Sequence, residues 1–226
     1  MSSKNICTTK IDALLFDLDG TLVDTAADFV AVLNAQRRAH GYDPLDELLI
    51  RNTVSNGARA LTHLAFGGAE GEPEFEAYRR ELLENYLAIV GQHASLFPGM
   101  DGVLQTCLEQ QIPWGIITNK PRRFTEKLLD SMNLHDSCSL VVCADDVSKP
   151  KPDPESMLLA AERLKIDLSK SVYVGDHVRD IAAGKAAHMI TVAAAYGYIM
   201  DDDLPLSWEA DYIIQQPIEL KTLFLS

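Results

Sequence analysis

The chain has 226 residues, of which 47% are hydrophobic, and its 20 basic and 33 acidic side chains give a net charge of −13. This apolar share is enough for a folded core and excludes a mainly disordered chain. The acidity argues against nucleic acid or an anionic membrane surface as a partner, and no apolar run reaches the ~18 residues of a membrane helix. Because the N-terminal stretch lacks the uninterrupted apolar region of a secretion signal, we expect a cytoplasmic protein.

Five short apolar runs predict the strands of a parallel sheet, at residues 13–16, 114–118, 140–143, 171–175 and 189–194. None alternates clearly between apolar and polar residues, which is typical of strands buried on both faces. Helical patterns at residues 122–133, 155–165 and 178–187 connect the later runs. This alternation of strand and helix predicts an α/β fold with a Rossmann-like, doubly wound parallel sheet.

The segment between the first two predicted strands, from about residue 20 to 113, is too long for one crossover connection. Residues 25–28 (TAAD) resemble a capping box, and an apolar stripe follows at Ala26, Phe29, Val30 and Leu33. A second helix is predicted at about 74–90. We therefore predict that residues 1–23 and 96–226 form the α/β core domain and that residues 24–95 form an inserted helical cap.

Polar side chains follow four of the predicted strands, in the order Asp17 and Asp19, Thr118 and Asn119, Lys149 and Lys151, and Asp176 and Asp180. Ligands of parallel α/β sheets bind at the carboxyl ends of the strands, so we expect these side chains to converge. Clustered carboxylates require a cation, and a site with only oxygen ligands favours Mg²⁺. An aspartate can attack phosphorus, and a second acid can protonate the leaving oxygen.

The blocks DLDGT, ITN, KPDPE and VGDHVRD occur in this order and resemble the four signatures of the haloacid dehalogenase superfamily of phosphatases. The resemblance implies that Asp17 is the nucleophile and Asp19 the general acid/base. It also implies that Thr118 and Lys151 bind the phosphoryl group. The implied Mg²⁺ site consists of Asp17, the backbone carbonyl of Asp19, and Asp176, with Asp180 in support. Lys149 is the alternative to Lys151, but the interval 176 − 151 = 25 fits the superfamily better.

The segment NTVSNGARAL (52–61) offers a candidate substrate site in the cap, where Asn56, Gly57 and Arg59 begin a helix. Backbone N–H groups and an arginine there could hold a carboxylate, although an exposed helical arginine is more often simply solvated. Together with the TNKPRRF run, this segment resembles the phosphoglycolate phosphatase branch, and we also expect Asn119 to bind the substrate. That resemblance leaves phosphoglycolate and N-acetylmuramic acid 6-phosphate open as substrates, and both carry a carboxylate.

The expected function is therefore Mg²⁺-dependent hydrolysis of a small phosphate ester through an aspartyl-phosphate. A phosphosugar mutase on the same scaffold is the alternative enzyme, and a non-catalytic binding module is the alternative outside catalysis. A phosphonatase would need a cap lysine, and residues 24–95 contain none. The sequence leaves open whether the protein is a monomer or a dimer.

Overall fold

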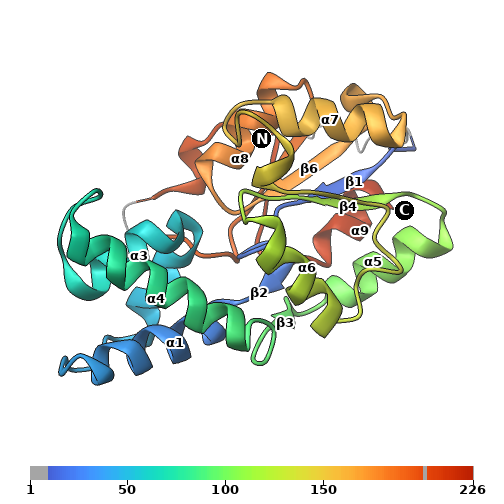
Figure 1. Ribbon diagram of the computed structural model, residues 1–226. Helices are drawn as coiled ribbons and strands as arrows, with labels where there is room; N and C mark the ends of the chain where they lie inside the picture. The colour runs from blue at the N-terminus through green and yellow to red at the C-terminus, as the bar shows by residue number, and fades with distance from the viewer. Residues whose placement is uncertain (1–9, 201–202, 226) are drawn as a thin grey trace.

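The computed structural model describes residues 10–200 and 203–225, and its centre is a parallel sheet flanked by helices (Figure 1). Six strands lie in the order β5-β4-β1-β6-β7-β8 and all pair in parallel. They are β1 (Leu14–Phe16), β4 (Trp114–Ile117), β5 (Leu140–Val142), β6 (Val172–Gly175), β7 (Ile190–Ala194) and β8 (Tyr212–Ile214). The predicted α/β fold is confirmed, and β8 is an edge strand that the sequence did not indicate.

Helices cover both faces of the sheet. They are α5 (Met100–Glu109), α6 (Arg122–Ser131), α7 (Glu155–Leu164), α8 (Val178–Ala186) and α9 (Glu219–Phe224). Leu14 and Phe16 belong to a core cluster that includes side chains of α5, α6 and α9. Leu15 lies in a second cluster with side chains of α7 and α8. Successive residues of β1 are therefore buried on opposite faces, which explains why the predicted strands read as continuous apolar runs.

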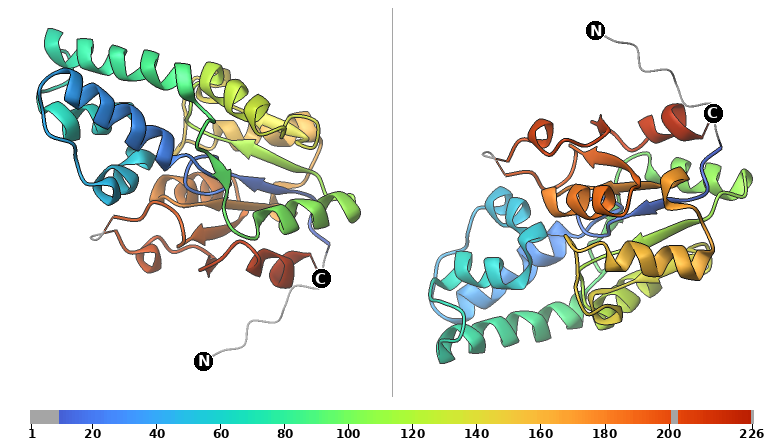
Figure 2. Two further views of the ribbon diagram at one scale, coloured as in Figure 1. Left: turned by 90° about the horizontal axis from the view of Figure 1, so that it is seen from below. Right: turned by 90° about the horizontal axis from the view of Figure 1, so that it is seen from above.

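The segment between β1 and β4 forms a separate group of helices, seen at one end of the molecule in both views of Figure 2. These helices are α1 (Ala26–Ala39), α2 (Glu47–Thr53), α3 (Gly57–Phe66) and α4 (Pro73–Ile89). Two short antiparallel strands, β2 (Val23–Asp24) and β3 (Ser95–Leu96), connect them to the sheet. The domain boundaries predicted from the sequence fall at these two strands, and the division into core and cap domains stays a prediction. None of the described helices combines the length and the apolarity needed to span a membrane.

The start of α1 differs from the predicted capping box. Thr25 is the N-cap residue, but its hydroxyl donates to Asp19 Oδ1 (2.6 Å) and does not cap the helix. The carboxylate of Asp28 accepts the backbone N–H groups of Gly91 (2.7 Å) and His93 (2.8 Å). The capping box prediction is therefore wrong, because both side chains bind groups outside α1 that the local sequence does not reveal.

Candidate active site

Three neighbouring strands place acidic and hydroxyl side chains at one edge of the sheet. Asp17 follows β1, Thr118 follows β4 and Asp176 follows β6, and β1 pairs in parallel with both of the other strands. Because their carboxyl ends coincide, the three residues meet at one site, as the sequence predicted for a parallel sheet. Thr118 is buried, and its Oγ1 accepts the backbone N–H of Lys120 (3.1 Å).

An acidic cluster lies at this edge, with carboxylate oxygens of Asp17, Asp176 and Asp180 all within 4.8 Å of one another. Burial raises the pKa of Asp176 to about 7, and the charges of Asp17 and Asp180 add to this increase. Burial likewise raises the pKa of Asp17 to about 6, against the lowering effect of Lys151. Buried acids with raised pKa values and only oxygen donors match the preferences of a hard divalent cation. The residues present therefore fit a Mg²⁺ ion.

Asp176 is held in place by hydrogen bonds from three parts of the chain. Its Oδ1 accepts the hydroxyl of Thr21 (3.1 Å), and its Oδ2 accepts the hydroxyl of Ser55 (2.9 Å) and the backbone N–H of Tyr198 (3.0 Å). Gly20 has a φ of +82°, and a Cβ atom added there would lie 2.1 Å from Asp176 Oδ2. The glycine in DLDGT therefore supplies both the turn and the room for this carboxylate.

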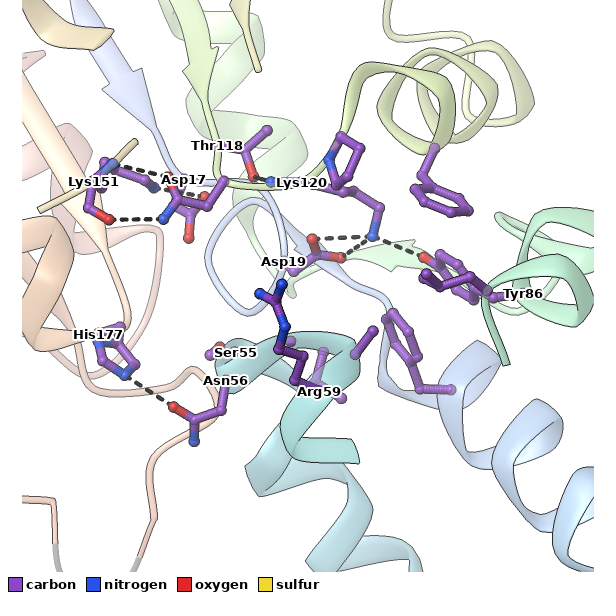
Figure 3. Close-up of a pocket in the computed structure, with 18 of the residues that line it drawn as sticks. Asp17, Asp19, Ser55, Asn56, Arg59, Tyr86, Thr118, Lys120, Lys151 and His177 are labelled. Atoms are coloured by element: carbon purple, nitrogen blue, oxygen red, sulfur yellow. Dashed lines mark hydrogen bonds and ion pairs between the residues drawn. The ribbon is translucent and has the colours of Figure 1, made fainter. Parts of the chain in front are cut away.

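Lys151 is the cation inside the acidic cluster. Its side chain is buried, and Nζ lies 3.0 Å from Asp17 Oδ1 (Figure 3). The same Nζ lies 2.7 Å from Asp180 Oδ1. Burial alone would lower the pKa of this ammonium group, but the two carboxylates raise it. Lys149 is exposed, and its backbone N–H donates a hydrogen bond to Glu155. Of the two lysines that the sequence left open, the structure places Lys151 beside Asp17.

Asp180 binds the side chain of Lys151, and Asn119 binds its backbone. The side chain of Asp180 is fully buried, and its Oδ2 also accepts the backbone N–H of His177 (3.1 Å). The amide of Asn119 donates to the Lys151 carbonyl (2.9 Å) and accepts the Lys151 N–H (3.0 Å). Asn119, predicted to bind substrate, lines the site and fixes the backbone of the lysine.

A second buried ion pair, which the sequence analysis missed, joins Asp19 to Lys120. Lys120 Nζ donates to both oxygens of Asp19 (2.8 and 3.1 Å) and to the hydroxyl of Tyr86 on α4 (2.9 Å; Figure 3). Burial lowers the pKa of Lys120, but Asp19 and Tyr86 together outweigh this effect and raise the pKa. The signal was available in the TNK block, where Lys120 follows Thr118 in the loop at the strand end. Tyr86 had no comparable signal, because α4 reaches the site only through tertiary packing.

A cavity of about 340 Å³ extends from the acids toward the helices α1, α3 and α4. Its apolar wall includes Phe29, Leu83, Tyr86 and Phe124, and the rings of Phe29 and Tyr86 stack at 4.1 Å between centroids. The rest of the lining includes polar side chains of the strand-end loops and of the turn that precedes α3. The cavity is therefore large enough for a ligand that combines a phosphate with an apolar or sugar portion.

The predicted cap residues Asn56, Gly57 and Arg59 all line this cavity. Asn56 Oδ1 lies 3.3 Å from His177 Nε2 and accepts a hydrogen bond from Arg179 (3.3 Å), so this loop contacts the core beside the acidic cluster. Arg59 pairs with Glu70 (2.6 Å), and its side chain is 62% exposed. The structure therefore brings the loop to the site but leaves Arg59 at its rim.

This combination of a parallel sheet, strand-end acids and a covering group of helices defines a hydrolase class. Residues 14–194 match the family described as haloacid dehalogenase-like hydrolase. The chain belongs to this family and is an enzyme.

Relatives that span nearly the whole chain are named phosphatases. The N-acetylmuramic acid 6-phosphate phosphatase of Pseudomonas aeruginosa is 42% identical and covers 93% of both chains. A phosphoglycolate phosphatase of Xanthomonas campestris pv. campestris is 39% identical, covering 92% of this chain and 94% of its own. Among solved structures, a predicted phosphoglycolate phosphatase from Haemophilus somnus superposes with a TM-score of 0.84 at 22% identity, covering 95% of this chain and 98% of its own.

Proposed function

We propose that this protein is a Mg²⁺-dependent phosphomonoesterase that hydrolyses a small phosphate ester carrying a carboxylate, through an aspartyl-phosphate. The observation that carries the proposal is the placement of Asp17 among two further acids and a buried lysine. Asp17, Asp176 and the backbone carbonyl of Asp19 would hold the Mg²⁺ ion, which when bound would neutralise charge on the phosphoryl oxygens. Lys151 and Thr118 would bind the same group, because an ammonium and a hydroxyl both donate to phosphate oxygens.

In the first step, a carboxylate oxygen of Asp17 attacks phosphorus, and the bond between phosphorus and the ester oxygen breaks. Asp19 donates a proton to the leaving alcohol. In the second step, a water molecule attacks the aspartyl-phosphate, Asp19 accepts the proton of that water, and the bond from phosphorus to Asp17 breaks. Inorganic phosphate leaves and Asp17 is regenerated.

N-acetylmuramic acid 6-phosphate is the substrate that the cavity supports best. Phosphoglycolate has only a two-carbon skeleton and no apolar group for the aromatic wall of Phe29, Tyr86 and Phe124. A sugar with N-acetyl and lactyl methyl groups would cover that wall and gain from its burial. Asn56, Gly57 and Arg59 would contact the sugar at the rim. The predicted cytoplasmic location remains part of this proposal.

The test is phosphate release from N-acetylmuramic acid 6-phosphate, phosphoglycolate and p-nitrophenyl phosphate, with Mg²⁺ and with EDTA. We expect turnover that requires Mg²⁺ and that disappears in Asp17→Asn, while circular dichroism of the variant stays unchanged. Retention of most activity by Asp17→Asn would overturn the nucleophile assignment. Isomerisation of a sugar phosphate without phosphate release would instead identify a mutase.

A further inference from the structure

Lys120 is a buried cation at the junction between the reacting edge of the sheet and the cavity. We propose that Lys120 recognises the carboxylate of the substrate and, by turning to it, releases Asp19 for acid/base chemistry. This inference rests on the proposed phosphatase function and assigns its specificity to one residue. The position of Lys120 beside Asp19 carries the argument, because Asp19 must lie next to the ester oxygen that leaves.

Within the part of the chain that the structure describes, the other cations that line the cavity already contact side chains other than Asp19. Lys151 is bound by Asp17 and Asp180. Arg59 pairs with Glu70 (2.6 Å) and Arg79 pairs with Glu76 (2.8 Å), both with substantial exposure to solvent. Arg179, the remaining cation of the lining, contacts His177 and Asn56. Among the cations of the cavity lining, Lys120 is the buried one that pairs with Asp19.

The aromatic wall lies against the ammonium group of Lys120 and shields it from water. Its Nζ lies 5.3 Å from the ring centroid of Phe29 and 4.8 Å from that of Tyr86, while the Tyr86 hydroxyl accepts one of its hydrogens (2.9 Å). The side chain is 6% exposed. A charge-assisted hydrogen bond is strong in such surroundings, because little water competes for the donor. A carboxylate that enters the cavity therefore meets a poorly hydrated cation.

Lys120 and the leaving oxygen compete for the same carboxylate. An ammonium has three donors, and two of those on Lys120 are on Asp19 while the third is on Tyr86. Thr25 also donates to Asp19 Oδ1 (2.6 Å). A substrate carboxylate that reaches Lys120 would take over one of its donors and free an Asp19 oxygen for the leaving group. A neutral ester would leave Lys120 on Asp19, so discrimination should appear in kcat as well as in KM.

A matched pair of substrates isolates this effect. N-acetylmuramic acid 6-phosphate and N-acetylglucosamine 6-phosphate differ only in the lactyl ether that carries the carboxylate. We would measure kcat and KM for both with the wild type, Lys120→Met and Lys120→Arg at saturating Mg²⁺. The ratio of the two kcat/KM values should fall about tenfold to a hundredfold in Lys120→Met, the range for one charge-assisted hydrogen bond. Lys120→Arg should restore part of the ratio.

Arg79→Gln and Arg179→Gln serve as matched controls, since each removes a different cation from the cavity lining. We expect each control to change both kcat/KM values by the same factor. A ratio that stays constant in Lys120→Met, or that collapses in either control, would overturn the inference. Failure of the wild type to release phosphate from any ester would refute the proposed function itself, which is a separate outcome.

Binding gives a second readout that does not depend on turnover. Calorimetry with Asp17→Asn and Asp17→Asn/Lys120→Met would give Kd for both sugar phosphates. The single variant should bind the carboxylated sugar more tightly, and the double variant should lose most of that preference. Equal preference in the two proteins would contradict the proposed contact. Thermal denaturation of each variant identifies any protein that fails to fold, and Lys120→Arg then supplies the comparison.

Discussion

Without Mg²⁺, this protein should lose stability as pH rises, and Asp176 should be the main cause. The pKa of this carboxyl is raised from its ordinary value of 3.8 to about 7 in the folded protein. Between these two values the folded chain keeps a proton that the unfolded chain releases, so the free energy of unfolding falls with rising pH. Each pKa difference of 1 corresponds to about 1.4 kcal/mol, so Asp176 costs on the order of 4 kcal/mol above pH 7.

The measurement is urea denaturation of metal-free wild type and Asp176→Asn at several values from about pH 5 to about pH 8. Asparagine keeps the shape of the side chain but has no charge. The stability of Asp176→Asn relative to wild type should therefore increase as pH rises, and the raised pKa of Asp17, about 6, acts in the same direction. Mg²⁺ should stabilise the wild type most at the highest pH. A difference between the two proteins that is independent of pH would refute the reasoning.

Three further substitutions test individual contacts. Gly20→Ala should lower Mg²⁺ affinity at least about tenfold in an activity titration, because the added methyl would collide with Asp176. Gly41 has a similar φ of +79° but nothing within 4 Å of an added Cβ, so Gly41→Ala should show only the backbone cost of about 1 kcal/mol in denaturation. Lys151→Met should lower phosphate release at least about a hundredfold, and Lys149→Met should change it less than about twofold; the reverse order would show that the wrong lysine was chosen. Tyr198→Phe should cost about 2 kcal/mol in thermal denaturation, because its hydroxyl accepts the N–H groups of Thr25 (2.7 Å) and Ala26 (2.9 Å), and an unchanged Tm would contradict this.

The sheet could be predicted from the sequence where burial on both faces leaves a continuous apolar run, as in β1 and β6. The edge strand β8 could not, because it has only three residues, of which Tyr212 and Ile213 are only partly buried, and it directly follows the acidic Asp211. Register and order within the sheet also depend on long-range pairing that no local pattern encodes.

The site could be predicted wherever a strand end supplies the residue. Asp17, Thr118 and Asp176 each follow a strand, so topology alone brings them together. Lys120 and Tyr86 come together only because α4 packs against the loop after β4. Thr25 donates to Asp19 and does not take its expected capping role. Contacts between the helices and the sheet are therefore the part of the site that sequence reasoning misses.

The paired strands β2 and β3 have a consequence for how this enzyme can diversify. Val23 pairs with Leu96 and Asp24 with Ser95, so the chain departs and returns at adjacent points. For the sheet, the segment between β2 and β3 is therefore equivalent to a loop whose two ends are held together. The entropic cost of closing such a loop grows only logarithmically with its length. Insertions or exchanges there leave the register of β1 with its neighbours undisturbed. New substrates can therefore be accommodated by different helices while the strands of the sheet keep their pairing.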